Sequence, residues 1–151
     1  MENGQKRQVR TIEGRTQLER LSSDECWQLL AQTPVGRIGI VIGGAPEIYP
    51  VNHVVDREAI LFRTDPGTKL AGLAMRPSVC YQVDGYDPES RTGWSVLVKG
   101  RATQLHSVAE RRRATTLPLD YWTSGTKPHW IRIQPSEVTG RRIWRRESVD
   151  R

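Results

Sequence analysis

The chain has 151 residues, of which 36% are hydrophobic and 26% are charged, which favours a single domain around one modest core. Its net charge of +6 suits a polyanion, but much of the excess lies near the two ends. No zinc-finger spacing or RNA-binding aromatic motif accompanies it, so nucleic acid is not the expected partner. No apolar run approaches the ~20 residues that span a bilayer, and none follows the basic N-terminus, so we expect a cytoplasmic protein without a membrane segment or secretory signal. The polar, basic start predicts a flexible arm over 1–20, a folded domain over 21–146 and a tail over 147–151.

Sequence patterns predict most of the elements that follow the arm. The first helix begins at a capping box formed by Ser22 and Glu25, and Pro34 stops it. Ile38 and Ile40 alternate with small or charged residues, which is the pattern of a half-buried strand. In chain order, the predicted elements are a helix over 23–32, strands over 35–42, 47–55 and 59–63, a helix over 68–75, a strand over 78–84, a polar loop over 85–93, a strand over 94–105, a helix over 107–113, and a final strand or strand pair over 129–133 and 137–144.

Six or seven strands and three short helices predict a mainly β fold. The connections between consecutive strands are too short for parallel crossovers, which need about a dozen residues or more. We therefore expect an antiparallel sheet that closes on itself as a barrel, with Pro50 interrupting its second strand.

The strongest functional signal is a strand-to-helix corner that reads Ile-Leu-Phe-Arg-Thr-Asp-Pro-Gly-Thr-Lys-Leu over residues 60–70. Arg63 and Lys69 supply cations, Thr68 supplies a hydroxyl, and Gly67 allows a close turn where the first N–H groups of a helix lack partners. Arginine and lysine form charge-assisted hydrogen bonds to a phosphate dianion. The corner therefore predicts a phosphate site. The alternative is that both cations are surface charges and that Thr68 is a plain N-cap.

Neither the cysteines nor the histidines show the spacing of metal ligands. Cys26 and Cys80 are expected to be small buried hydrophobes that form no disulfide. His106 and His129 lack a metal-spaced partner. His53 is expected to be a partly exposed strand histidine, with a proton donor or a haem contact as the alternative. We therefore predict no metal site.

The order of the motifs resembles that of a known family. After the first helix come Pro-Val-Gly-Arg, Pro-Val-Asn, Leu-Phe-Arg-Thr-Asp-Pro-Gly-Thr-Lys, Val-Cys-Tyr-Gln-Val-Asp and Gly-Trp-Ser-Val-Leu-Val-Lys-Gly-Arg-Ala. This order, over residues 21–145, is similar to that of the pyridoxamine 5′-phosphate oxidase-like family of flavin-binding split barrels, and above all to its short actinobacterial members. The resemblance implies a homodimer that binds FMN at the subunit interface and acts as an oxidoreductase on a small molecule.

The resemblance also implies which residues contact the flavin. The implied phosphate ligands are Arg63, Thr64, Gly67, Thr68 and Lys69. The implied ring contacts are Pro50, Val51, Asn52 and His53, with Trp94 and Ser95 from the fifth strand. From the other subunit, Arg141, Arg142 or Trp144 would complete the site. Asn52 could equally finish a strand turn, and Trp94 could equally fill the dimer core.

The chain departs from pyridoxamine 5′-phosphate oxidase itself near its C-terminus, where it has no Arg-x-His pair to grip a substrate phosphate. Pyridoxamine phosphate is therefore not the expected substrate. Related actinobacterial proteins use a deazaflavin coenzyme whose polyglutamyl tail suits a basic groove, so a deazaflavin is the alternative to FMN. A non-catalytic flavin- or haem-binding protein is a further alternative. Trp122 and Trp130 are expected to pack at the end of the barrel rather than to line a substrate pocket.

Overall fold

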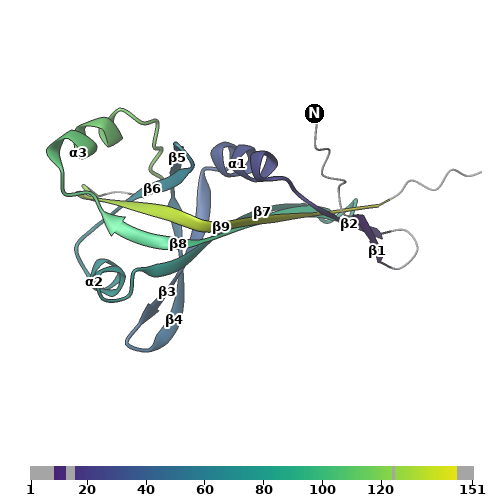
Figure 1. The fold of residues 1–151 in the computed structure, drawn as a ribbon, viewed down its shortest axis with the longest axis horizontal. Helices are drawn as coiled ribbons and strands as arrows, with labels where there is room; N and C mark the ends of the chain where they lie inside the picture. The colour runs from purple at the N-terminus through teal and green to yellow at the C-terminus, as the bar shows by residue number, and fades with distance from the viewer. Residues whose placement is uncertain (1–8, 13–15, 124, 146–151) are drawn as a thin grey trace, which may run out of the picture.

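The computed structural model describes residues 9–12, 16–123 and 125–145, which form one curled antiparallel sheet with three helices (Figure 1). The strands are β1 (Val9–Ile12), β2 (Thr16–Arg20), β3 (Val35–Ile42), β4 (Ala45–Asn52), β5 (Val54–Asp56), β6 (Ala59–Thr64), β7 (Ser78–Asp87), β8 (Thr92–Gln104) and β9 (His129–Arg145). The helices are α1 (Ser23–Gln32), α2 (Thr68–Met75) and α3 (Val108–Thr115). The prediction of a mainly β, antiparallel, barrel-like fold is confirmed.

The last strand, β9, organises the sheet. It pairs with β8 along most of its length, with β6 through its first five residues and with β2 through its last five. The continuous path runs β1-β2-β9-β8-β7-β3-β4, so β4 is its final strand. Beyond the body of the molecule, β7, β8, β9 and β2 continue as a narrow ribbon, seen to the right in Figure 1. One part of the sheet therefore curls into a body, and another projects from it.

Alternating side chains of the curled sheet build the main core. Ile38, Tyr81, Val83, Val96 and Val98 are all fully buried, and each is separated from the next apolar position of its strand by one residue. The apolar positions predicted from period-two alternation are therefore the ones that face inward.

Helix α1 packs against this core. At the start of α1, the Ser22 amide donates to Glu25 Oε2 at 2.8 Å and the Glu25 amide donates to Ser22 Oγ at 3.2 Å, which confirms the capping box. The helix buries Cys26 and Leu30 against the sheet. A second, smaller cluster lies by α3 and includes Trp130, which is 3% exposed and packs there as predicted.

Proline 50 does not interrupt its strand. It pairs with Arg37 inside the continuous strand β4, and the chain breaks only at His53, between β4 and β5. Because β4 is the final strand of the sheet path, a proline there removes no ladder hydrogen bond from a second neighbour.

The predicted loop and final strand pair also differ from the structure. Most of the expected loop over 85–93 is strand, because β7 continues to Asp87 and β8 begins at Thr92. The C-terminal segment is a single strand, β9, with a bulge at Ser136, whose hydroxyl donates to the Lys99 carbonyl at 3.1 Å. Gly100 lies opposite this bulge, where any Cβ would collide with the β9 backbone.

Part of the expected N-terminal arm belongs to the sheet. β2 pairs with the last five residues of β9, and β1 pairs with β2. An exposed strand edge recruits such a segment through backbone hydrogen bonds, which hydrophobic patterning does not reveal. The expected tail over 147–151 lies outside the described residues.

None of the helices that the structure describes is long and apolar enough to cross a membrane. The described residues also contain no cluster of three or more His, Cys, Asp and Glu side chains that could hold a metal ion. Both cysteines are free, but Cys80 is exposed, so the expectation that both are buried is wrong for Cys80. Its position in β7 alternates with the buried Val79 and Tyr81, which places it on the outer face.

His53 is buried rather than partly exposed, because the break between β4 and β5 turns its ring into the core. Nε2 lies 2.8 Å from the Leu30 carbonyl, which can only accept, so Nε2 carries the proton. Nδ1 then accepts a hydrogen bond from the Tyr81 hydroxyl at 2.5 Å. Burial lowers the pKa of His53, with the hydrogen bond to Leu30 opposing the shift.

We expect the free energy of unfolding to fall below about pH 6.5, the ordinary pKa of histidine. The unfolded chain protonates His53 there, whereas the folded chain does so only at lower pH. The contribution of neutral His53 to the free energy of unfolding is therefore complete above this pH. It is lost as the pH falls through the folded pKa, by at most about 1.4 kcal/mol per pH unit. Urea unfolding at several pH values should show a shallower decline for His53→Gln and an unchanged one for exposed His106→Gln. An unchanged decline in His53→Gln would contradict the attribution of this pH dependence to buried, neutral His53.

Candidate functional site

A cavity of about 240 Å³ collects the candidate residues at one end of the sheet. β4 supplies Pro50, Val51 and Asn52, β6 supplies Arg63, and α2 supplies Lys69. The rest of its lining comes from Val35 and from the segment over 116–128 that joins α3 to β9, called the linker below. The linker residues are Tyr121, Trp122, Thr123 and Lys127. Five of the eleven predicted contacts thus meet around one cavity.

Three side chains of the sheet and its corner fix the linker over this cavity. Arg63 Nε donates to the Lys127 carbonyl at 2.7 Å, and its Nη2 donates to the Thr126 carbonyl at 3.1 Å. Asn52 Oδ1 accepts from the Trp122 amide at 3.1 Å, and Asp65 Oδ1 accepts from the Lys127 amide at 3.0 Å. The irregular linker is therefore held by partners that are far from it in the sequence.

Lys69 and Lys127 place two ammonium groups at the cavity. The Lys69 Nζ lies 5.0 Å from the centroid of the Tyr49 ring, and the Lys127 Nζ lies 3.9 Å from Asp65 Oδ2. Burial lowers the pKa of Lys69, the nearby charge of Lys127 lowers it further, and Asp65 opposes both. A bound anion would relieve the repulsion between the two cations, so this arrangement favours an anionic ligand.

The beginning of α2 adds backbone donors beside Lys69. Gly67 is the N-cap, with φ of 153°, and no side chain caps the helix. The Ala71 amide donates to the Gly67 carbonyl at 3.0 Å. Thr68 is the exposed first residue of α2, whereas Thr64 is buried at the end of β6 and donates to the Asp65 carbonyl at 3.3 Å. Thr64 thus belongs to the corner, but its side chain is buried and is not exposed as that of Thr68 is.

The remaining predicted contacts lie elsewhere in the single chain. Trp94 and Ser95 lie on β8, where they pair with Arg142 and Arg141 of β9 in the projecting ribbon. A separate cavity of about 460 Å³ brings Trp94 together with Arg142 and Trp144. His53, with both ring nitrogens engaged in the core, does not line the cavity of Lys69.

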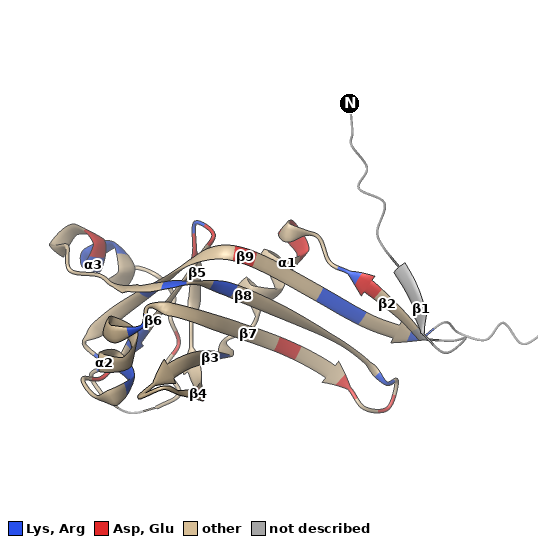
Figure 2. Ribbon diagram, turned by 60° about the horizontal axis from the view of Figure 1, so that its bottom comes forward, with Lys and Arg blue, Asp and Glu red and all other residues tan. Residues whose placement is uncertain are grey.

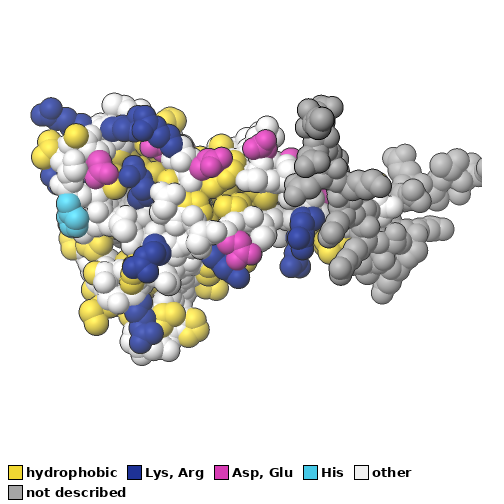
Figure 3. All heavy atoms as spheres, in the orientation of Figure 1, with side chains coloured by type: hydrophobic (Ala, Val, Ile, Leu, Met, Phe, Trp, Pro, Cys, Tyr) yellow, Lys and Arg dark blue, Asp and Glu magenta, His cyan; other side chains and the backbone are white. Residues whose placement is uncertain are grey.

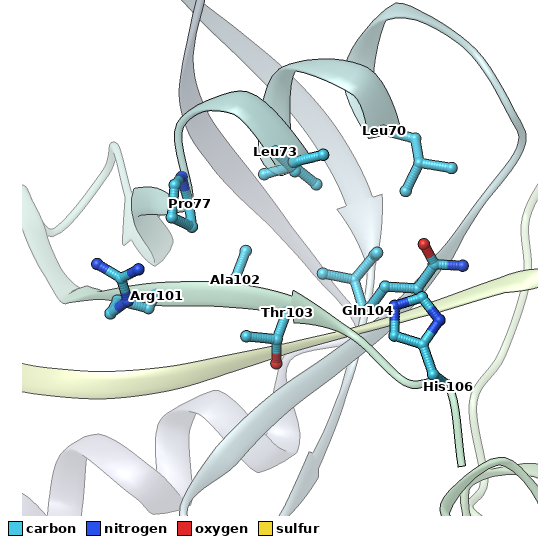
Figure 4. Close-up of a pocket in the computed structure, with 10 residues that line it drawn as sticks. Leu70, Leu73, Pro77, Arg101, Ala102, Thr103, Gln104 and His106 are labelled. Carbon is cyan, nitrogen blue, oxygen red and sulfur yellow. The ribbon is translucent and has the colours of Figure 1, made fainter. Parts of the chain in front are cut away.

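A third cavity, of about 410 Å³, lies between α2 and β8 (Figure 4). Leu70, Leu73 and Ala102 form its apolar walls, while Arg101 and His106 stand at opposite ends. Although it is larger than the cavity of Lys69, its polar groups do not converge. We therefore take the smaller cavity, where cations, aromatic rings and backbone donors meet, as the candidate site.

Charges elsewhere on the described surface are mixed. Figure 2 shows Lys and Arg on α2 and along β9, with acidic residues on neighbouring segments. On the face seen in Figure 3, basic and acidic side chains are interspersed. Among the described residues on that face, the basic side chains do not form a continuous strip of the kind that tracks a nucleic-acid backbone.

Comparison with known proteins identifies the family. A sequence profile described as pyridoxamine 5′-phosphate oxidase matches residues 22–142, which is most of the chain. The chain belongs to this family. The resemblance seen in the motifs is confirmed, and the curled antiparallel sheet is the family's split barrel.

Several known proteins are similar to this chain. A solved FAD-binding protein of Mycobacterium smegmatis is 39% identical, with a TM-score of 0.70, and the match covers 82% of this chain and 98% of that one. A solved structure from Corynebacterium glutamicum is 31% identical, with a TM-score of 0.74, over 83% and 97% of the two chains. An uncharacterised protein of Mycobacterium tuberculosis is 36% identical over 129 residues, which are 82% of this chain and 84% of that protein.

The motifs of the pyridoxamine 5′-phosphate oxidase family did not reveal the linker's part in the site. Tyr121, Thr123 and Lys127 were not predicted, and Trp122 lines the cavity instead of packing at the barrel end. Trp122 is 66% exposed, yet its indole N–H donates to Asp120 Oδ2 at 3.1 Å. The one available signal was an aromatic pair, Tyr121-Trp122, in a segment without helix or strand periodicity.

Proposed function

We propose that this protein binds a flavin nucleotide at the cavity of Lys69 and uses it as an oxidoreductase on a small organic molecule. The observation that carries the proposal is the convergence of Lys69 and Lys127 on one cavity beside the uncapped start of α2. A flavin phosphate is a dianion that such donors stabilise, at about 1.5–3 kcal/mol for each charged hydrogen bond.

The chemistry of the other lining residues also suits a flavin. Tyr121 and Trp122 offer aromatic surface, and β4 ends the sheet path, so one edge of its backbone pairs with no described strand. Backbone groups of Pro50, Val51 and Asn52 can therefore serve the polar edge of the ring. When bound, the flavin supplies hydride and electron transfer, and the protein binds and orients it.

The size of the cavity supports a dimeric site. About 240 Å³ is below the 300–1,000 Å³ of typical ligand pockets, so one chain encloses only part of a nucleotide-sized ligand. We propose that a second copy completes the enclosure with Trp94, Ser95 and Arg142 or Trp144, which lie away from Lys69 in the single chain.

The proposal covers FMN, FAD and a deazaflavin as cofactors. The Mycobacterium smegmatis relative is described as an FAD-binding protein, which supports a flavin in general. Among the usual axial ligands of haem iron the lining offers only Tyr121, whereas its two lysines suit a phosphate, so we propose a flavin rather than haem.

Titration of the purified protein with riboflavin, FMN, FAD and the deazaflavin coenzyme tests the proposal, with tryptophan fluorescence as the readout. We expect the phosphorylated flavins to bind at least about tenfold more tightly than riboflavin, because only they reach the two lysines. Reduction of the bound flavin by NADPH, followed by its reoxidation, would then establish turnover. A protein that binds none of the four would contradict the proposal.

A further inference from the structure

Arg63 has partners that a direct phosphate ligand would not need. Two of its donors are used by consecutive carbonyls of the linker, those of Thr126 and Lys127. Its guanidinium carbon lies 5.4 Å from the centroid of the Tyr121 ring and 5.2 Å from that of Trp130, both within cation–π range. Arg63 is thus committed to the linker by two hydrogen bonds and by the Tyr121 ring, and to β9 by the Trp130 ring.

Lys127 is held from both sides of its peptide unit. Its carbonyl accepts from Arg63, its amide donates to Asp65, and its ammonium lies 3.9 Å from the other oxygen of Asp65. Lys127 itself lies outside any helix or strand, two residues before β9 begins at His129. Side-chain partners from β6 and the corner after it therefore decide where this ammonium lies.

We propose that Lys127 is the second phosphate ligand of the site and that Arg63 is a positioning residue that acts through it. The inference rests on the proposed flavin function. Lys69 and Lys127 line the same cavity, and the charge of Lys127 acts on Lys69. The anion-binding pair thus consists of one lysine from the strand-to-helix corner and one from the linker, and Arg63 fixes the distance between them.

The competing assignment makes Arg63 a phosphate ligand in its own right, as the family resemblance implies. The two assignments differ in additivity. If the two residues bind phosphate independently, the fold-losses of FMN affinity in the two single variants multiply in the double variant. If Arg63 only positions Lys127, removing it causes no further loss once Lys127 is gone.

The experiment compares FMN with riboflavin, which has no phosphate, for the wild-type protein, Arg63→Ala, Lys127→Ala and the double variant. Lys127→Ala should weaken FMN binding about tenfold or more and leave riboflavin binding unchanged. Arg63→Ala should produce a similar loss, and the double variant should lose no more than the larger single loss. Lys99→Ala, a variant of an exposed lysine paired with Glu137, should behave as the wild type.

Two conservative variants separate positioning from charge. Arg63→Lys keeps the positive charge but loses the planar fork that reaches two carbonyls, so it should lose FMN affinity nearly as Arg63→Ala does. Lys127→Arg keeps a donor at the cavity and should retain most of the affinity. If Arg63→Ala does not fold, these two variants still distinguish the two assignments.

Losses that multiply in the double variant would overturn the inference and make Arg63 a ligand. An unchanged ratio of FMN to riboflavin affinity in Lys127→Ala would overturn it as well. Failure of the wild-type protein to bind either flavin would overturn the flavin proposal itself, together with the inference that rests on it.

Discussion

Replacing Lys69 with alanine should weaken FMN binding by about ten- to one hundred and fiftyfold, the equivalent of one charged hydrogen bond, and leave riboflavin binding unchanged. Lys69 is half-buried at the start of α2, where a phosphate would meet both its ammonium and the helix N–H groups. Fluorescence titrations with the two flavins measure the difference directly. Equal losses for FMN and riboflavin would mean that the substitution damages the fold or the ring site instead.

The dependence of FMN affinity on pH provides a second test of Lys69. In the free protein its pKa is lowered by burial and by Lys127, whereas a bound phosphate would raise it again. Binding therefore takes up a proton, so the affinity is highest below the lowered pKa and falls as the pH rises through it. Lys69→Arg, whose guanidinium stays charged, should bind FMN without this decline. A decline that persists in Lys69→Arg would have to come from another group.

Most of the sheet could be predicted from sequence because its inward residues follow a local rule. Ile38 and Ile40 alternate in β3, as do Tyr81 and Val83 in β7, and all four face the core. The predictions fail where the pairing of a strand depends on residues that are distant in the sequence. Pro50 is tolerated because β4 lies at the end of the sheet path, which no local pattern can reveal.

The candidate site also has a part that local sequence predicts and a part that depends on distant contacts. The corner of Gly67, Thr68 and Lys69 is contiguous in sequence, so its turn, helix start and cation could be recognised together. Lys127 is held near Lys69 by contacts of the linker with Arg63 and Asp65, which lie far from it in the sequence. Hydrogen bonds between residues more than sixty positions apart leave no periodic signal, so the sequence could place Arg63 at the corner but not its contacts with the linker.

Mixing two defective variants should restore flavin binding if each site uses both subunits. Lys69→Ala removes the phosphate ligand, and Trp94→Ala removes the ring contact proposed to come from the partner, worth about 1–3 kcal/mol if it stacks on the flavin. In a symmetric dimer, an equal mixture of the two variants forms mixed dimers in about half of all cases, each with one complete site and one site that carries both changes. About a quarter of the sites should then bind FMN as tightly as the wild type.

The control is a mixture of two differently tagged preparations of Lys69→Ala, which should recover no tight sites. Size measurements must show that the mixed dimers form. If they form and no tight sites return, the two residues serve the same chain, or Trp94 serves packing alone. The separation in the single chain makes recovery the expected result, because Trp94 lies with Arg142 and Trp144 around a different cavity from that of Lys69. In the proposed dimer, the ribbon of one subunit would meet the body of the other, so that one flavin contacts both sets.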